Sequence, residues 1–189
     1  MKNAIILHGL YDKEEYYGPD FPSPSNAHWF PWLQRQLQLR DIKASTPEVA
    51  WTYKMLWNDW VKEVERFEIN ENTLLVGHSM GGGFWVRYLS EHPELKVAKV
   101  VLVAPWLNLS HEEDTNFFDF QLNPKIADQA KEFVIFSSDN DNIDVQNSVN
   151  HLRNKLKDAR FRDFHNYGHF CYEDMKTDAF PELLDECLA

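Results

Sequence analysis

A single serine, Ser79, lies among four glycines at a spacing that suits nucleophilic catalysis. Residues 77–81 read GHSMG, the pattern G-x-S-x-G, after an apolar run and before an aromatic one. A serine at a tight turn between strand and helix has a strained backbone, and residues two positions before and after it crowd each other, so Gly77 and Gly81 must lack side chains. The N–H of Met80 would then face an oxyanion formed at Ser79. We expect a nucleophile here; the alternative is a purely structural turn.

A serine hydroxyl is a poor nucleophile without a neighbouring base, so a histidine is required. In chains with this motif the order is serine, acid, histidine. The histidines that follow Ser79 are His92, His111, His151, His165 and His169. His169 follows Gly168 in a predicted turn after the last predicted strand, where a ring can fold back over the strand ends. We favour His169 as the base, with His165 as the alternative.

The acid is expected just after the strand-like run that ends at residue 136. The segment reads SSDNDNIDV, in which Asp139, Asp141 and Asp144 compete. Asp144 suits the first turn of the next helix. Asp141 lies further into the loop and is our choice, with Asp139 second. A calcium loop is excluded because its required glycine is replaced by Asp144 and its twelfth position is Asn150. No metal or organic cofactor is expected.

The second oxyanion donor is expected just after the first predicted strand, where residues 8–10 read HGL. Gly9 lets this loop approach the serine, and the N–H of Leu10 would donate, with Tyr11 as the alternative. His8 and His78 both precede their turns, so we interpret them as turn-shaping residues and not as bases.

These residues need a scaffold that brings strand ends together, and the sequence alternates strand-like and helix-like runs. Strands are predicted at residues 4–7, 41–45, 73–76, 97–104, 133–136 and 160–164. Helices are predicted at residues 29–37, 57–64, 80–90, 145–156 and 176–188, with a loop at 11–25 and a small lid at 106–122. Such alternation predicts an α/β protein with a mostly parallel sheet of about six strands and helices on both faces. Ligands bind at the carboxyl ends of such strands.

Length and composition narrow the function further. The 189 residues suit one domain, 1–189, and the net charge of −11 disfavours nucleic acid and anionic membranes as partners. Two cysteines are too few for a disulfide framework, the N-terminus reads as a first strand, and no run spans a membrane, so a cytoplasmic location is expected. The sequence itself supports no protein partner.

Four motifs give the chain a resemblance to a known family. HG at 8–9, HWFPWL at 28–33, GHSMGG at 77–82 and YGHF at 167–170 resemble the small YdeN-like serine hydrolases, relatives of retinoblastoma-binding protein nine. The resemblance implies a compact α/β-hydrolase fold with a minimal cap, and a triad of Ser79, Asp141 and His169. Asp141 is followed by Asn142 and Ile143, where family members tend to carry an apolar residue and a proline.

The expected activity is hydrolysis of small acyl esters through a covalent acyl-enzyme. Two alternatives stay open: amide or peptide hydrolysis by the same triad, and a protein-binding module on a hydrolase scaffold. Several aromatic residues have two interpretations: they line a pocket for the acyl chain, or they belong to the ordinary core. They are Trp29, Trp32, Trp106, Phe117 and Phe118.

Overall fold

The computed structural model describes all residues except 112 and 114, and its strands form one parallel sheet in the order β2-β1-β3-β4-β5-β6. The strands are β1 (Asn3–Leu7), β2 (Lys43–Ser45), β3 (Thr73–His78), β4 (Val97–Val103), β5 (Ala130–Ser138) and β6 (Arg160–Phe164). Every neighbouring pair is parallel. This confirms the predicted fold class and all six predicted strands.

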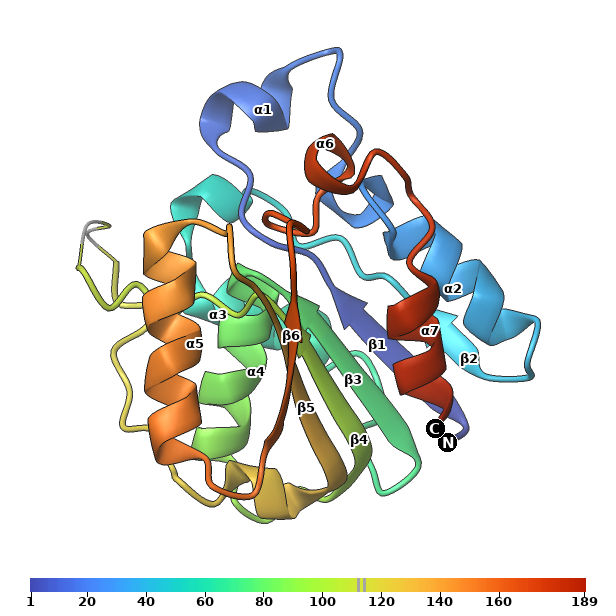
Figure 1. Cartoon of the computed structure of the whole chain (residues 1–189), viewed down its shortest axis with the longest axis vertical. Helices are drawn as coiled ribbons and strands as arrows, with labels where there is room; N and C mark the ends of the chain where they lie inside the picture. Colours follow the sequence, from blue (N-terminus) through green and yellow to red (C-terminus); the bar gives the residue numbers. More distant parts are fainter. Residues whose placement is uncertain (112, 114) are drawn as a thin grey trace.

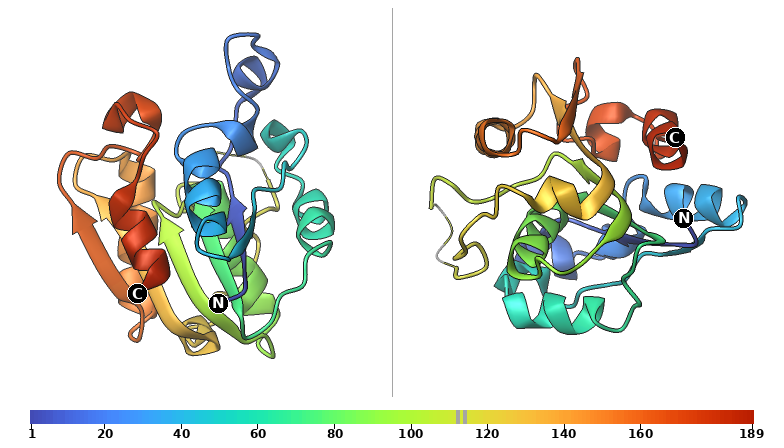
Figure 2. Two further views of the ribbon diagram at one scale, coloured as in Figure 1. Left: turned by 90° about the vertical axis from the view of Figure 1, so that its right-hand side faces the viewer. Right: turned by 90° about the horizontal axis from the view of Figure 1, so that it is seen from below.

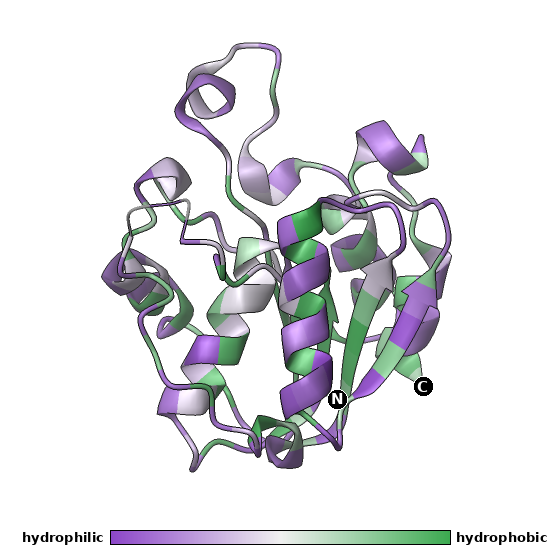
Figure 3. Cartoon of the chain, turned by 60° about the vertical axis from the view of Figure 1, so that its left-hand side comes forward, coloured by the Kyte–Doolittle hydropathy of each residue, from purple (hydrophilic) through white to green (hydrophobic). Residues whose placement is uncertain are grey.

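Helices cover both faces of the sheet (Figures 1 and 2). One face carries α2 (Phe30–Gln38) and α7 (Pro181–Leu188), and the other carries α3 (Trp57–Val64), α4 (Met80–Glu91) and α5 (Ile143–Lys155). Strands β3 and β4 are therefore buried at every residue. Figure 3 shows the same layering, with hydrophobic strands inside and hydrophilic residues on α1 and the outer side of α5.

Two short helices lie above the carboxyl ends of the strands, α1 (Lys13–Tyr17) and α6 (Tyr172–Met175) (Figure 1). The prediction of an unbroken loop at 11–25 was wrong. Asp12 accepts the N–H of Glu15 at 2.8 Å and its own N–H donates to the Glu15 carboxylate at 3.2 Å, which is a capping box that starts a helix.

The last helix is shorter than predicted because it begins at Pro181 and not near residue 176. Proline lacks an N–H and fixes φ, so it is tolerated in a helix only in the first turn. Pro31 occupies the equivalent place at the start of α2, as its position in the sequence predicted.

The aromatic residues at 29 and 117 belong to the core and not to a pocket. Both side chains are fully buried. The ring of Phe117 packs against Trp57 and Trp60, so it fixes its segment to the core. The described residues of 106–122 form no helix or strand, which fits a minimal cap. No helix in the described part of the chain has the length and apolar character needed to cross a membrane.

Candidate active site

Ser79 occupies the turn between β3, which ends at His78, and α4, which begins at Met80. Its backbone has φ 53° and ψ −120°, a strained conformation for a residue other than glycine. Neighbouring elements hold it there. The Ser79 N–H donates to Val103 O at 3.0 Å, and its carbonyl accepts the N–H groups of Gly83 and Trp106, each at 3.0 Å. The side chain is therefore fixed at the carboxyl ends of the central strands.

The glycines on either side of Ser79 are required by close backbone approach. A Cβ on Gly77 would lie 2.6 Å from the carbonyl oxygen of Gly81, and a Cβ on Gly81 would lie 2.4 Å from the carbonyl oxygen of His8. Both contacts are with main chain, which cannot move aside as a flexible side chain could. The crowding predicted from the motif is present, and Gly81 also brings α4 against the end of β1.

His169 and Asp141 form a hydrogen-bonded pair at the same end of the sheet. Nδ1 of His169 lies 2.9 Å from Oδ1 of Asp141, whose side chain is 1% exposed. A carboxylate only accepts hydrogen bonds, so Nδ1 carries the proton and the neutral ring keeps its lone pair on Nε2. The N–H of Asn142 donates to the same carboxylate oxygen at 2.6 Å and holds it in place.

The two alternatives, Asp139 and His165, form a second pair beside the first. The Asp139 carboxylate bonds Nδ1 of His165 and accepts the N–H of Asn166 at 2.9 Å. That N–H, together with His165, lowers the pKa of Asp139. The side chains of Asp139 and His165 are 51% and 80% exposed, whereas the Asp141–His169 pair is mostly shielded from water. The shielded pair is the better candidate, because the acid that orients a catalytic imidazole is buried.

Polar residues that the sequence analysis did not single out join the two loops that carry these pairs. Ser138 Oγ accepts the N–H of Tyr167 at 3.0 Å, and Asn140 Oδ1 accepts the N–H of Gly168 at 2.8 Å. Ser138 Oγ–H also donates to Asn140 Oδ1 at 2.8 Å. The run of small polar side chains at residues 137–142 was the signal in the sequence for these contacts, because such residues often form hydrogen bonds with backbone groups in turns.

His78, the residue before Ser79, brings the histidine loop to the serine. The ring centroids of His78 and His169 are 4.8 Å apart, and Nε2 of His78 lies 2.7 Å from the carbonyl oxygen of His169. No hydrogen bond joins Ser79 Oγ to a side chain in the described residues. Catalytic hydrogen bonds are often long without substrate and shorten when it binds.

The loop after β1 lies directly against Ser79. A Cβ on Gly9 would be 3.0 Å from Cβ of Ser79 and 3.5 Å from its Oγ. The N–H groups of Leu10 and Met80 donate to no acceptor among the described residues. The N–H of Tyr11, the alternative donor, already bonds Oγ1 of Thr52 at 3.3 Å. Of the three candidates, the backbone N–H groups of Leu10 and Met80 are therefore the ones available to bind an oxyanion.

A cleft of about 570 Å³ opens between the loop after β1 and the histidine loop. Leu10 and His169 line it, and Tyr11, Phe21 and Tyr172 add aromatic surface. Its volume falls in the range of small-molecule sites. Trp32 and Trp106 do not line this cleft, so of the two interpretations of these tryptophans it does not support the acyl pocket.

Burial sets the ionisation of several groups around the cleft. It lowers the pKa of His78 well below the ordinary value, with a further contribution from the nearby His169. Burial also lowers the pKa of His8, whose Nε2 accepts the N–H of Val49 at 3.0 Å. Burial and then Asp174 raise the pKa of Cys171 to about 12, so this thiol stays protonated and is a poor nucleophile.

One group in the described chain resembles a set of metal ligands. His28, Cys171 and Glu173 place one ligand atom each within 4.8 Å of one another on the wall of the cleft. Nδ1 of His28 already accepts the N–H of Tyr172 at 3.2 Å. Because that lone pair is engaged by a backbone N–H, the group fits a metal poorly.

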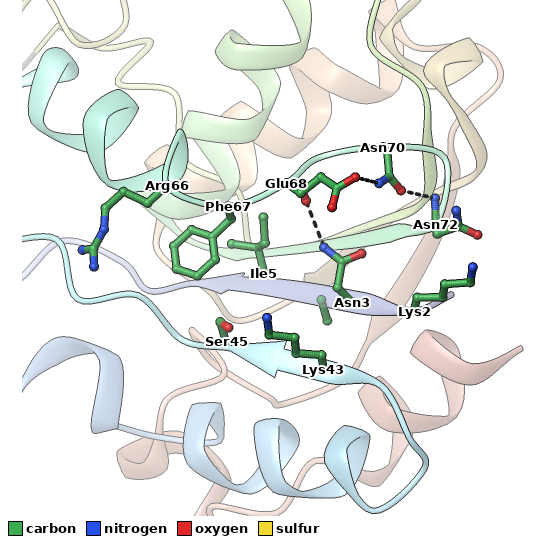
Figure 4. Close-up of a pocket in the computed structure, with 11 residues that line it drawn as sticks. Lys2, Asn3, Ile5, Lys43, Ser45, Arg66, Phe67, Glu68, Asn70 and Asn72 are labelled. Atoms are coloured by element: carbon green, nitrogen blue, oxygen red, sulfur yellow. Dashed lines mark hydrogen bonds between the residues drawn. The ribbon is translucent and has the colours of Figure 1, made fainter.

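A second pocket, of about 500 Å³, lies at the opposite end of the sheet around the start of β1 and β2 (Figure 4). Asn3 Nδ2 donates to Glu68 O at 3.0 Å, and Asn70 Nδ2 donates to the Glu68 carboxylate at 2.7 Å. The lining holds no histidine, so it lacks the imidazole base of a serine–histidine–aspartate triad.

An all-parallel sheet with a strained serine after its third strand and an aspartate–histidine pair at the same end of the sheet defines the α/β-hydrolase class. The chain belongs to the serine hydrolase family, whose sequence model matches residues 18–185.

Individual proteins are similar to the chain in sequence or in fold. The chain is 28% identical to YdeN of Bacillus subtilis (strain 168) over 194 residues, covering 97% of this chain and 93% of YdeN. The crystal structure of the B. subtilis ydeN gene product superimposes with a TM-score of 0.80 at 22% identity, covering 98% of this chain and 96% of that one. A YdeN-like protein of Pectobacterium atrosepticum gives a TM-score of 0.65 at 16% identity, covering 98% and 88%.

Proposed function

We propose that this serine hydrolase cleaves small acyl esters through Ser79, His169 and Asp141. The observation that carries the proposal is the shielded Asp141–His169 pair, which leaves the lone pair of the imidazole on Nε2, at the same end of the sheet as a serine in a strained turn. Neutral imidazole with this tautomer is the form that a serine nucleophile needs as its base.

The reaction proceeds in two stages. His169 Nε2 takes the proton of Ser79 as Oγ attacks the ester carbonyl, and the N–H groups of Met80 and Leu10 bind the oxyanion. Nε2–H then gives its proton to the departing alcohol, which leaves an acyl group on Ser79. Water, deprotonated by His169, releases the acid and restores the serine. Asp141 keeps the imidazole in the productive tautomer throughout.

The cleft favours small substrates over long lipids. Its volume of about 570 Å³ accommodates a short acyl chain and a modest alcohol. His169 lines it, although Ser79 does not, and Glu15 of α1 and Tyr172 of α6 form part of its wall in place of a large cap. The cytoplasmic location expected from the sequence stays a prediction.

Hydrolysis of p-nitrophenyl acetate by the parent protein and Ser79→Ala tests the proposal. We expect Ser79→Ala to lose turnover by about 10³-fold or more and to keep its thermal midpoint, because only Oγ is removed. Equal turnover by the two proteins would contradict the role of Ser79. A matched anilide should react far more slowly than the ester; comparable rates would favour amide hydrolysis.

A further inference from the structure

The mechanism leaves two buried aromatic residues unexplained, Trp29 in the motif HWFPWL and His78 beside the nucleophile. Their exposed fractions are 0% and 3%. Each ring has an N–H that must find a partner when buried. Both partners lie in the loop that carries His169.

The two rings bond consecutive carbonyl groups of that loop. His78 Nε2 lies 2.7 Å from the carbonyl oxygen of His169, and Trp29 Nε1 donates to the carbonyl oxygen of Phe170 at 3.1 Å. A carbonyl only accepts, so His78 carries its proton on Nε2. The centroids of the His78 and Trp29 rings are 5.8 Å apart, so the two donors pack together as one unit.

The loop needs such contacts because its backbone is strained. Gly168 has φ 54° and Phe170 has φ 59°, so His169 lies between two residues in the left-handed region. The N–H of His169 is held separately, by Asp174 Oδ2 at 2.8 Å. Together with the Asp141 bond, these contacts engage the N–H, the carbonyl and Nδ1 of His169, and leave Nε2 for the reaction.

We propose that His78 and Trp29 are positioning residues. They fix the candidate base by hydrogen bonds to the carbonyl groups of His169 and Phe170. This inference rests on the proposed function, since it assigns the two residues a part in catalysis without contact with substrate. A displacement of about 1 Å at the base is enough to lower a rate by about 10²-fold.

The ionisation of His78 agrees with this role. Burial lowers the pKa of His78 well below the ordinary value. The ring therefore stays neutral when His169 becomes an imidazolium during the reaction, and two adjacent cations do not form.

Four variants test the proposal. Trp29→Phe and His78→Leu remove an N–H but keep an apolar ring or a similar volume, whereas His78→Gln keeps an N–H donor. Trp32→Phe is the matched control, because Trp32 lies in the same motif and its ring donates to no described residue. We expect Trp29→Phe and His78→Leu to lower kcat for p-nitrophenyl acetate about tenfold or more with KM within about twofold, while His78→Gln and Trp32→Phe stay close to the parent.

A second readout does not depend on turnover. The NMR signal of the His169 Nδ1 proton, held by Asp141, should broaden or vanish in Trp29→Phe and His78→Leu and persist in the other two. Parent-like kcat and a parent-like signal in both donor-deleted variants would overturn the positioning role. A parent without Ser79-dependent turnover would overturn the proposed function instead, and the proton signal would then decide the positioning role alone.

Discussion

Nδ1 of His169 lies 2.9 Å from the carboxylate of Asp141, although the two residues come from different loops, 28 positions apart in the chain. The neighbouring Asp139 bonds His165 in the same way, at the surface. Two aspartate–histidine pairs thus lie side by side at the carboxyl end of the sheet, and they differ in exposure more than in geometry.

This difference leads to a matched pair of substitutions. Asp141→Asn should lower kcat by about 10³- to 10⁴-fold, because the amide no longer fixes the tautomer that leaves Nε2 free. Asp139→Asn should stay within about fivefold of the parent, since its carboxylate orients an exposed ring. Steady-state hydrolysis of p-nitrophenyl acetate measures both. A larger loss in Asp139→Asn than in Asp141→Asn would assign the acid to the exposed pair.

Two glycines near Ser79 should respond differently to alanine. In Gly81→Ala the new Cβ meets main chain at 2.4 Å, so we expect the folded state to be destabilised by more than about 3 kcal/mol. In Gly9→Ala the new Cβ meets the side chain of Ser79 at 3.0 Å, so we expect a folded protein with kcat/KM lowered about tenfold. Thermal unfolding and ester hydrolysis separate the two effects. A stable, active Gly81→Ala would contradict the close approach of α4 to β1.

Acid should destabilise the protein before its carboxylates titrate. Burial lowers the pKa of His8, His28 and His78 below the ordinary 6.5. The unfolded chain therefore binds more protons than the folded one below about pH 6.5, and the free energy of unfolding falls as pH falls. The slope is about 1.4 kcal/mol per pH unit for each histidine that protonates only on unfolding.

Urea unfolding at pH 7.5 and 5.5 measures this slope. His78→Gln should reduce the pH dependence of the free energy of unfolding, because up to about one proton fewer is taken up on unfolding. The pKa values of Asp139 and Asp163 are lowered from 3.8, so these carboxylates titrate below pH 5.5 and do not contribute to the slope between pH 7.5 and 5.5. A free energy of unfolding that is equal or higher at pH 5.5 would contradict the buried neutral histidines.

A buried carboxylate far from the site should affect stability alone. Glu186 on α7 is 4% exposed, lies 3.1 Å from Arg162 and 3.4 Å from Lys99, and also bonds Arg160. Glu186→Gln removes the buried carboxylate that the three cations share and leaves Lys99 and Arg160 paired with the half-exposed Glu132. We expect a loss of up to about 3 kcal/mol. Asp185→Asn, on the exposed side of the same helix, should change the free energy of unfolding by less than about 0.5 kcal/mol.

Calorimetry or urea unfolding compares the two variants, and kcat should be unchanged in both. Equal stability of Glu186→Gln and Asp185→Asn would show that the ion cluster contributes nothing to the docking of α7.

The local patterns of the sequence predicted the sheet because each strand carries its own signal. β4 is apolar at almost every position and β3 leads directly into the glycine turn, so neither needed tertiary information. The short helix α1 was missed although Asp12 and Glu15 have the capping-box spacing, because Pro19, Pro22 and Pro24 indicated a loop.

The choice between Asp139 and Asp141 could not be settled in the same way. It depends on how the loop after β5 aligns with the loop after β6, where Ser138 pairs with Phe164 at the last step of the ladder. That register is a tertiary property. The contacts from Ser138 and Asn140 to backbone N–H groups, and from Trp29 to Phe170, likewise join segments that no local pattern connects.

Reaction with a fluorophosphonate probe, followed by peptide mass spectrometry, tests the central claim most directly. The account predicts that the probe modifies Ser79 in the native protein, that Ser79→Ala takes up no label, and that Asp141→Asn reacts much more slowly. A native protein that stays unlabelled at Ser79 under conditions that label a known serine hydrolase would contradict it.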